Sequence, residues 1–564
     1  MKISGAKIVV ETLIEQGCDV VFGFPGGQVI DIFDELYSAR SRIKHILAAH
    51  EQGAAHAADG YARSTGKTGV VIATSGPGAT NLVTGIATAY LDSVPMVAVT
   101  GNVACTLIGR DSFQEVDIVG ITMPITKHNF IVKDINELAD TLRTAFKIAK
   151  SGRPGPVLVD IPKDIQEALC EFEPNPQPVI PYPLTFASEE KLQNAAKMID
   201  NCERPYIYFG GGVISGKASQ QILALAEKID APLGCSLMGL SAVPHDHPRF
   251  LGMQGMHGHF ASSVAQDEAD LIIALGVRFS DRATGDDSRY SKHSAIIHID
   301  IDGAELHKNI SADIAIKGDL HDSLERLIAM TSEKKHPIWA ERIEQLKAEE
   351  QKRTETALSI TKDKCGGKLS PYEIIDIISS KAEDDTIIIT DVGQHQMWTA
   401  QRYPLKTPRT FLSSGGLGTM GFGLGAAVGA AAASGKRCIL FTGDGSFGMD
   451  LCELATAVSQ ELPITIVIMN NGVLGMVRQW QTLFFDKRYS ATTLDRKTDF
   501  SKVAEAFGAK GGYASSAAEL EKLADTALSC STPFVIDCAV DCDEPVLPML
   551  PQGGTIDDMI TEIK

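Results

Sequence analysis

Paired cysteines, long apolar runs and basic stretches are all missing from this sequence of 564 residues. Its 11 cysteines are scattered without a C-x-x-C pair, which argues against a zinc ribbon and favours reduced thiols over a disulfide framework. The longest run of low polarity, residues 421–434, is mostly glycine and alanine and is too short to span a bilayer. A formal net charge of -19, with no basic stripe to offset it, opposes binding to nucleic acid or to an anionic membrane.

Aromatic residues are also scarce, at 6%, and the first residues have helical apolar spacing with acidic groups, unlike a signal or transit peptide. We therefore expect a cytoplasmic protein that neither enters a membrane nor binds nucleic acid. Glycine is abundant, with 51 residues in local clusters, which favours tight loops where the backbone approaches a ligand. An acidic protein that handles anionic substrates must supply positive charge locally.

Strand-like apolar runs alternate with helical patterns over most of the chain, which is typical of parallel α/β architecture. Two stretches interrupt this alternation. Residues 171–186 contain five prolines and predict an extended connector. Residues 331–370 are highly charged and predict a solvated helix that leads into a linker. We therefore predict an α/β fold of three doubly wound parallel-sheet domains, at residues 1–170, 187–330 and 368–545.

Polar side chains follow two strand-like runs in the third predicted domain. Residues 437–442 are followed by Gly443-Asp444-Gly445, and residues 464–469 by Asn470-Asn471, with a helical pattern from about 447 to 460 between them. In a right-handed β-α-β unit both turns lie at the carboxyl ends of neighbouring strands, where open α/β sheets bind ligands. Asp444 and Asn471 carry the hard oxygen atoms that Mg²⁺ prefers, and the glycines let a diphosphate approach the backbone. Either motif alone is more simply explained as an ordinary β-α turn.

Together the two motifs, GDG and NN with 24 residues between them, resemble the thiamine diphosphate motif of an enzyme superfamily. The resemblance implies that thiamine diphosphate binds with Mg²⁺, and that Asp444, Asn471 and the backbone carbonyl of Val473 bind the metal. It also implies that Met420 supports the bent cofactor, although a methionine in a glycine-rich run is often only a packing residue. The cofactor contacts implied in this domain are Gln394, His395, Met420, Gly443, Asp444, Gly445, Ser446 and Asn471.

Glu51, in the first predicted domain, follows the strand-like run 43–49 and opens a helical stretch. By itself, a glutamate in a first helical turn indicates only a favourable interaction with the helix dipole. Residues 50–81, however, closely resemble the pyrimidine-binding domain of acetolactate synthases, in which this glutamate activates the cofactor. The resemblance implies that Glu51 bonds to the aminopyrimidine ring. It further implies that this domain of one subunit faces the diphosphate domain of another, so that the protein is a homodimer or homotetramer.

Four short stretches resemble the biosynthetic acetolactate synthases in particular: residues 24–27, 109–117, 125–129 and 475–481. The resemblance implies that they line the substrate pocket, with an arginine supplying positive charge for the carboxylate of the second substrate. A buried tryptophan is, without this context, more often a core residue. The implied pocket residues, besides Glu51, are Gly27, Phe113, Gln114, Lys127, Arg282, Met476 and Trp480.

The second predicted domain has a strand followed by three glycines, at residues 206–212, without the full G-x-G-x-x-G pattern of a dinucleotide-binding turn. Several of its stretches resemble the FAD-binding stretches of the biosynthetic enzymes, with Ser280 standing where an aspartate is usual. The implied flavin is structural, because the net reaction is not a redox reaction. Its implied contacts are Arg153, Gly210, Gly211, Gly212, Met256, His257, Gly258, Gly276, Arg278, Asp300, Ile301 and Asp319.

The resemblance covers nearly the whole chain. It implies a carboligase that condenses two pyruvate molecules into 2-acetolactate and CO₂, or pyruvate and 2-oxobutanoate into 2-aceto-2-hydroxybutanoate. This is the first common step of valine, leucine and isoleucine biosynthesis, and the family often pairs such a chain with a small regulatory subunit. Three alternatives stay open: a flavin-linked pyruvate oxidase, a catabolic acetolactate synthase without flavin, and a nucleotide-binding scaffold whose catalytic motifs are spent.

Overall fold

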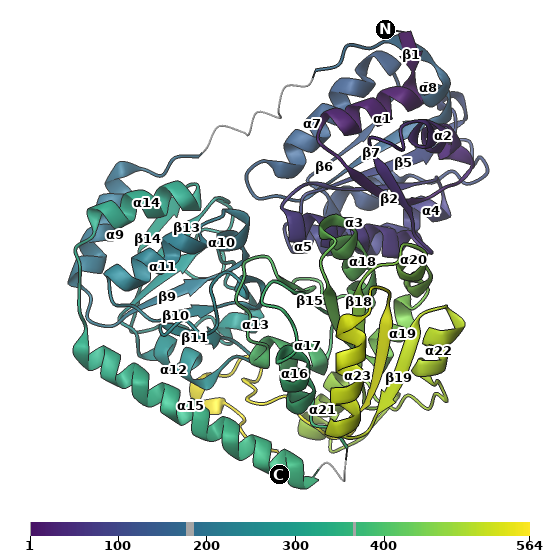
Figure 1. The fold of residues 1–564 in the computed structure, drawn as a ribbon. Helices are drawn as coiled ribbons and strands as arrows, with labels where there is room; N and C mark the ends of the chain where they lie inside the picture. The colour runs from purple at the N-terminus through teal and green to yellow at the C-terminus, as the bar shows by residue number, and fades with distance from the viewer. Residues whose placement is uncertain (1, 176–184, 365–367, 564) are drawn as a thin grey trace.

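Three parallel sheets of six strands each, flanked by helices, form three α/β units, which confirms the predicted fold class (Figure 1). The computed structural model describes residues 2–175, 185–364 and 368–563. The sheets lie at residues 20–162, 205–317 and 387–539, and the domain boundaries around them stay predictions. Within the described ranges no helix combines the length and the apolar character that a membrane crossing requires. A separate antiparallel pair joins β1 (Lys2–Ser4) to β8 (Leu169–Glu171).

The N-terminal sheet has the order β3-β2-β4-β5-β7-β6, which is 2-1-3-4-6-5 when its strands are numbered along the chain. Because the chain leaves β2 and β4 toward opposite edges, their carboxyl ends form a topological switch point, where open α/β sheets bind ligands. The strands are β2 (Val20–Phe24), β3 (Lys44–Leu47), β4 (Gly69–Ala73), β5 (Met96–Asn102), β6 (His128–Ile131) and β7 (Pro156–Pro162). The helices are α1 (Gly5–Glu15), η1 (Gly27–Val29), α2 (Ile30–Ser38), α3 (Glu51–Thr65), α4 (Pro77–Asn81), α5 (Val83–Leu91), η2 (Cys105–Leu107), α6 (Ile118–Thr122), η3 (Met123–Ile125), η4 (Ile135–Glu137), α7 (Leu138–Lys150) and α8 (Lys163–Glu167).

The C-terminal sheet, β16-β15-β17-β18-β20-β19, repeats the order 2-1-3-4-6-5, with its switch point at the ends of β15 and β17. The strands are β15 (Ile387–Thr390), β16 (Phe411–Leu412), β17 (Cys438–Gly443), β18 (Ile464–Asn470), β19 (Lys510–Ala514) and β20 (Phe534–Ala539). The helices are α16 (Pro371–Ser379), α17 (Gln394–Arg402), α18 (Phe422–Ser434), α19 (Asp444–Asp450), α20 (Glu453–Ser459), α21 (Gly475–Phe484), α22 (Phe500–Ala506), α23 (Ala517–Ser529) and η6 (Ile556–Asp558).

The central sheet differs. Its order, β11-β10-β9-β12-β13-β14, is 3-2-1-4-5-6 along the chain, the order of dinucleotide-binding sheets. The strands are β9 (Pro205–Phe209), β10 (Leu233–Cys235), β11 (Phe250–Met253), β12 (Leu271–Leu275), β13 (Ala295–Asp300) and β14 (Ile314–Lys317). The helices are α9 (Glu189–Asn201), α10 (Gly211–Ser215), α11 (Ser219–Lys228), η5 (Leu237–Gly239), α12 (Phe260–Glu268), α13 (Asp281–Thr284) and α14 (Leu320–Met330).

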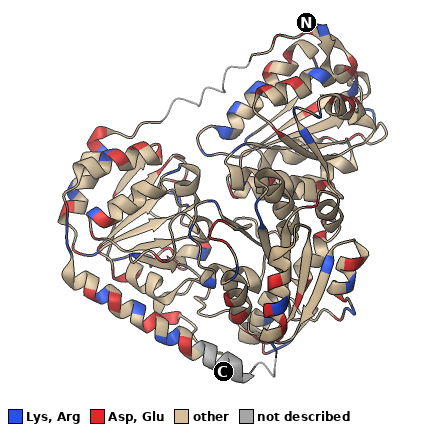
Figure 2. Cartoon of the chain, viewed as in Figure 1, with Lys and Arg blue, Asp and Glu red and all other residues tan. Residues whose placement is uncertain are grey.

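The charged stretch after the central sheet forms the long helix α15 (Pro337–Lys364), along which acidic and basic residues alternate (Figure 2). The helix is expected from the sequence, but its first half is not solvated on all sides, contrary to that expectation. Trp339, Ile343 and Leu346 are buried in a core shared with the central sheet. Their spacing puts them on one face of the helix, and the Trp339 indole donates to the Pro205 carbonyl at 3.0 Å.

The N-terminal and C-terminal units meet through α3 and α18, which pack at backbone distance. A Cβ added to Gly60 would lie 2.1 Å from the carbonyl oxygen of Ala426, and one added to Gly429 would lie 1.8 Å from that of Ala57. Only glycine permits such an approach. One apolar cluster therefore extends from the N-terminal sheet through both helices into the C-terminal sheet.

Candidate active site

The switch point of the C-terminal sheet brings together the residues predicted to hold a diphosphate. His395 lies between two glycines: a Cβ added to Gly393 or Gly443 would lie 2.8 or 3.0 Å from its ring. The Ser446 hydroxyl, in the first turn of α19, donates to the Val392 carbonyl at 3.0 Å and joins this helix to the loop after β15. Burial lowers the pKa of His395 to about 3, so the ring is neutral near pH 7. Its Nε2 is buried without a hydrogen-bond partner among the described residues, which leaves a polar atom for a ligand bound at this edge.

The predicted metal ligands follow neighbouring strands of the same sheet. Gly443 of β17 pairs with Met469 of β18, so Asp444 and Asn471 follow adjacent strand ends. Asp444 is 6% exposed, and burial raises its pKa to about 6. The Asn471 side-chain oxygen accepts the Val473 backbone N–H at 3.1 Å, which fixes the turn. A buried carboxyl that costs free energy to ionise, beside an amide oxygen, fits a divalent cation.

Two more predicted cofactor residues border this edge. The Gln394 side-chain oxygen accepts an N–H of Asn471 at 3.3 Å, and its amide donates to Gln479 at 3.0 Å. Gln394 therefore orients the predicted metal ligand. The Met420 methyl lies 3.7 Å from where a Cβ on Gly445 would stand, so Met420 packs directly on the GDG turn.

Glu51 follows the edge strand β3, and its side chain reaches the segment that follows β4 at the switch point of the N-terminal sheet. Helix α3 begins at Glu51, as the sequence predicts, and is capped by the His50 ring, which accepts the Gln52 N–H at 3.1 Å. The Glu51 Oε2 accepts an N–H of the Asn81 side chain at 2.9 Å. Its Oε1 lies 3.2 Å from where a Cβ on Gly78 would stand. The segment after β4 therefore holds the carboxylate, which is half-buried.

Three predicted substrate residues lie near this N-terminal edge. Gly27 is exposed after β2, with open space where a Cβ would stand. The carbonyl oxygen of Gln114 lies 2.8 Å from where a Cβ on Gly76 would stand, so Gln114 packs on the loop that follows β4. Phe113, next to it, is 84% exposed and free to contact another molecule.

Lys127 has a different environment. Its ammonium donates to the carbonyls of Ile148 and Ser151 at 2.5 and 2.6 Å, at the carboxyl end of α7. Burial lowers its pKa to about 8. In this structure Lys127 therefore caps a helix, and its role toward a substrate stays a prediction.

Arg282, Met476 and Trp480 gather where the central unit meets the C-terminal unit. The Arg282 guanidinium lies 5.6 Å from the centroid of the Trp480 ring and 3.5 Å from the Met256 sulfur. Met476 lies one turn before Trp480 on α21. The Trp480 indole N–H is buried without a partner among the described residues. These three predicted pocket residues therefore share one border between two domains.

Four predicted flavin residues, all of them glycines, lie at the switch point of the central sheet, at the ends of β9 and β12. A Cβ added to Gly212 would lie 2.6 Å from the Gly276 Cα, and one added to Gly210 would lie 2.5 Å from the Gly276 oxygen. Gly211 lies between them. Contact between the two loops thus requires these glycines, and the bare backbone fits the close approach of a dinucleotide phosphate.

Two predicted flavin residues bond to other protein groups. The Arg153 guanidinium donates to Glu305 at 2.6 Å and to the Ser93 hydroxyl at 2.7 Å. The Asp319 carboxylate caps α14 by accepting the Asp322 N–H at 3.0 Å. The other predicted contacts, Met256, His257, Gly258, Arg278, Asp300 and Ile301, lie at or after the ends of β11, β12 and β13.

Asn81 and Glu453 lie at the site but were not anticipated from the sequence. Asn81 ends the short helix α4 and holds Glu51. Glu453 begins α20, is 1% exposed, and contacts the turn before Glu51. A single acidic residue in the otherwise small and apolar helix ELATAVS was the available signal, because a buried charge requires partners.

Comparison with known proteins identifies the class that this fold and site define. Residues 3–121, 192–327 and 391–538 match, respectively, the N-terminal TPP binding domain, the central domain and the C-terminal TPP binding domain of thiamine pyrophosphate enzymes. The chain belongs to this class.

Its relatives define the family within the class. It is 46% identical to the probable acetolactate synthase large subunit of Methanocaldococcus jannaschii, over 100% of this chain and 96% of the relative. It is 44% and 43% identical to the large subunits of acetolactate synthase isozymes 1 and 2 of Escherichia coli, over 100% of this chain and 98% and 100% of those proteins. The chain is a member of the acetolactate synthase large subunit family.

Proposed function

We propose that this protein uses thiamine diphosphate and Mg²⁺ to condense two pyruvate molecules into 2-acetolactate and CO₂, or pyruvate and 2-oxobutanoate into 2-aceto-2-hydroxybutanoate. This reaction opens the biosynthesis of valine, leucine and isoleucine. One observation carries the proposal. The Glu51 carboxylate is held by Asn81 at one switch point, while Asp444 follows β17 at the switch point of a second sheet of the same order and Asn471 follows the adjacent strand β18.

The chain's own residues account for binding and proton transfer. Thiamine diphosphate, when bound, supplies a carbon nucleophile and accepts the electron pair left behind as CO₂ departs. Asp444, Asn471 and the Val473 carbonyl would hold Mg²⁺. The His395 Nε2, buried without a partner among the described residues, would bond to a phosphate oxygen, whose negative charge favours the protonated ring. Glu51 would exchange a proton with the aminopyrimidine ring through Oε1, because Oε2 already accepts from the Asn81 amide.

The second 2-oxo acid would bind beside the border of the central and C-terminal units. Its carboxylate would pair with the exposed Arg282 guanidinium, which lies over the Trp480 ring. Trp480 and Met476 would exclude water around the reacting carbons and select the side chain of this substrate. The Arg282 guanidinium also supplies local positive charge in a chain whose net charge of -19 otherwise repels anionic substrates.

Two copies of the chain would be needed to complete each site. Within one chain the turn before Glu51 bonds to Glu453, which lies beyond the far end of α19, whereas Asp444 begins α19. We infer that Glu51 of one copy faces the Asp444 edge of another, in a homodimer or homotetramer.

Exposed apolar side chains support this assembly. Phe113, Met123, Leu417 and Met449 are 84%, 65%, 42% and 59% exposed, and they lie close in sequence to residues of the two cofactor edges. Such groups in a chain of low aromatic content favour a protein–protein interface.

FAD would bind at the central switch point, since the order 3-2-1-4-5-6 is typical of dinucleotide binding. Its role would be structural. A smaller regulatory subunit is a further proposed partner, supported by relatives that are named large subunits. We also propose a cytoplasmic location, which the scattered, unpaired pattern of the 11 cysteines favours.

The test is an anaerobic assay of the full chain with pyruvate, thiamine diphosphate and Mg²⁺, without an electron acceptor. We expect acetolactate to accumulate and the purified protein to be yellow. Acetate formed only when an electron acceptor is added would instead indicate a pyruvate oxidase. A colourless but fully active protein would remove the flavin from the proposal, and absence of turnover would overturn it.

A further inference from the structure

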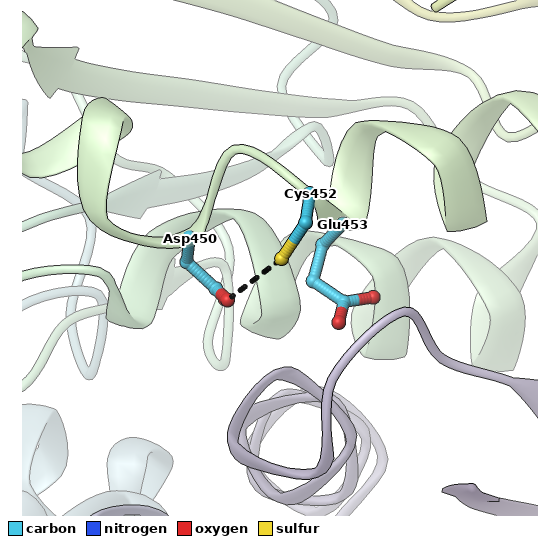
Figure 3. Close-up of side chains that lie close together, drawn as sticks. All are labelled: Asp450, Cys452 and Glu453. Carbon is cyan, nitrogen blue, oxygen red and sulfur yellow. Dashed lines mark hydrogen bonds between the residues drawn. The ribbon is translucent and has the colours of Figure 1, made fainter.

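The Glu453 side chain lies between two domains and points toward the N-terminal unit (Figure 3). It is 1% exposed. Its Oε1 accepts the backbone N–H of His50 at 2.9 Å, and its Oε2 accepts that of Ala49 at 3.3 Å. These two amides immediately precede Glu51. A carboxylate of the C-terminal unit therefore binds the turn that leads into the proposed activating residue.

The surroundings of Glu453 fit this contact closely. A Cβ added to Gly53, in the first turn of α3, would lie 2.2 Å from the Glu453 Oε1, so the helix can approach only with glycine there. The Thr456 hydroxyl donates to Glu453 at 2.6 Å and accepts the Ala49 N–H at 3.1 Å. Hydrogen bonds from amides at a helix N-terminus to a carboxylate are charge-assisted and directional.

Asp450 and Cys452 lie beside Glu453 (Figure 3). Burial and the neighbouring Glu453 carboxylate raise the pKa of Asp450 well above its usual range. Burial also raises the pKa of Glu453, and the hydrogen bonds from Thr456, Ala49 and His50 oppose that rise. Ligand atoms of the three residues lie within 4.8 Å of one another, which is also the arrangement of a cation site. Both Glu453 oxygens, however, already accept N–H or O–H groups, which favours the positioning of a turn over metal binding.

We propose that Glu453 is a positioning residue for Glu51. It fixes the turn of residues 49–51 from one side, while Asn81 fixes the Glu51 carboxylate from the other. This inference rests on the proposed role of Glu51. The C-terminal unit, whose Asp444 edge would bind the diphosphate in one site, would therefore also orient the Glu51 carboxylate that the same chain contributes to a second site.

The first experiment is Glu453→Gln. The amide keeps the size of the side chain but has one acceptor oxygen, and its NH₂ group opposes one of the two backbone N–H groups. We expect kcat for acetolactate formation to fall about tenfold or more, because small misplacements of a reacting group are costly. The concentration of thiamine diphosphate that half-saturates the enzyme should change less than about twofold, since His395, Asp444 and Asn471 are untouched. Hydrogen exchange at the amides of Ala49 and His50 should accelerate in the variant.

A double-mutant cycle separates positioning from a general structural effect. If Glu453 acts through Glu51, the E51Q/E453Q enzyme should be no slower than E51Q alone. Losses that multiply would overturn the inference, as would an E453Q enzyme of unchanged kcat. Thr456→Val, which removes one donor to Glu453, provides the same test if E453Q does not fold. Its expected loss of kcat is about two- to fivefold, and absent in the E51Q background.

Arg409→Met is the matched control at the other end of α3. The Arg409 guanidinium donates to the carbonyls of Arg63 and Ile214, at 3.1 and 3.0 Å, and thus joins three domains without touching the turn before Glu51. We expect R409M to lower the melting temperature while leaving kcat within about twofold. An E51Q enzyme of full activity would remove the proposed role of Glu51 itself, a result distinct from any failure of Glu453.

Discussion

The two outer sheets share the strand order 2-1-3-4-6-5, whereas the central sheet has the order 3-2-1-4-5-6. The outer sheets nevertheless carry different groups at equivalent edges. One holds a carboxylate bonded to an amide side chain, Glu51 with Asn81, and the other holds oxygen donors on adjacent strands, Asp444 and Asn471. On the proposed function, strand order determines where a ligand binds, and the loop residues at that edge determine the chemistry.

The largest effect should come from Glu51→Gln, which tests the task assigned to the N-terminal edge. An amide cannot exchange a proton with the cofactor ring, so acetolactate formation should fall about 100-fold or more. The Mg²⁺ concentration for half-maximal activity should stay the same. The control is Glu137→Gln at an exposed position of the same domain, which should be fully active. A shift in Mg²⁺ requirement in E51Q would contradict the division of tasks between the two sheets.

Asp444→Asn tests the equivalent edge of the C-terminal sheet. Loss of the buried carboxylate should raise the Mg²⁺ concentration for half-maximal activity at least about tenfold, with part of the activity restored at high Mg²⁺. Titration of acetolactate formation against Mg²⁺ measures it. Asp486→Asn, an exposed residue of the same unit, should leave the titration unchanged. If E51Q and D444N gave the same Mg²⁺ titration, the two edges would not differ as proposed.

Gly276→Ala tests whether the central sheet, whose strand order differs from that of the outer sheets, binds a separate ligand. The new Cβ would lie 2.7 Å from the Gly212 Cα, at a φ of 55°, and would force apart the two loops of the switch point. We expect the purified variant to lose most of its yellow colour while keeping its Mg²⁺ requirement. Gly17→Ala, with φ 78° but open space around the new methyl group, isolates the backbone strain of about 1 kcal/mol. A colourless G17A protein would show that general instability, and not the switch point, governs the colour.

The smallest expected effect concerns the packing of α3 against α18, which joins the N-terminal unit to the C-terminal unit. His56 of α3 lies against Phe422 of α18, and burial lowers its pKa from 6.5 to about 3. Below about pH 6.5 the unfolded chain binds a proton that the folded chain does not, so the free energy of unfolding falls as the pH decreases. For one histidine this loss is at most about 1.4 kcal/mol per pH unit.

His56→Leu should therefore lose less thermal stability than the parent protein between about pH 7.5 and about pH 5.5. The substitution to leucine removes no hydrogen bond, because both ring nitrogens of His56 lack partners among the described residues. Melting temperatures at the two pH values measure the difference. His321→Gln, at an exposed position, should leave the pH dependence as it is. Equal acid sensitivity of H56L and the parent would refute this account of the joint.

Local patterns in the sequence predicted the elements around the C-terminal edge closely. The strand expected at 464–469 is β18 (Ile464–Asn470), and that expected at 437–442 is β17 (Cys438–Gly443). The helix expected from about 447 to 460 is divided into α19 and α20 and begins at Asp444. Apolar periodicity marks the middle of an element, whereas its ends depend on a few hydrogen bonds that the period does not register.

Contacts between distant parts of the chain could not be predicted in this way. Glu453 and His50 are separated by 403 residues, and no local pattern joins them. Lys127 illustrates the converse. A family resemblance predicts a role at the substrate pocket, whereas in the folded chain its ammonium bonds to the end of a helix in its own domain. Only the folded backbone shows which carbonyl groups lie within reach of a long side chain.

The two glycines at the crossing of α3 and α18 limit the amino-acid substitutions that this protein tolerates. Any change at Gly60 or Gly429 adds atoms where the opposite backbone lies 2.1 or 1.8 Å from the added Cβ, and no smaller residue exists. Every mutation at these two codons therefore enlarges the joint. In a library of random variants selected only for intact protein, both positions should be strongly depleted of substitutions.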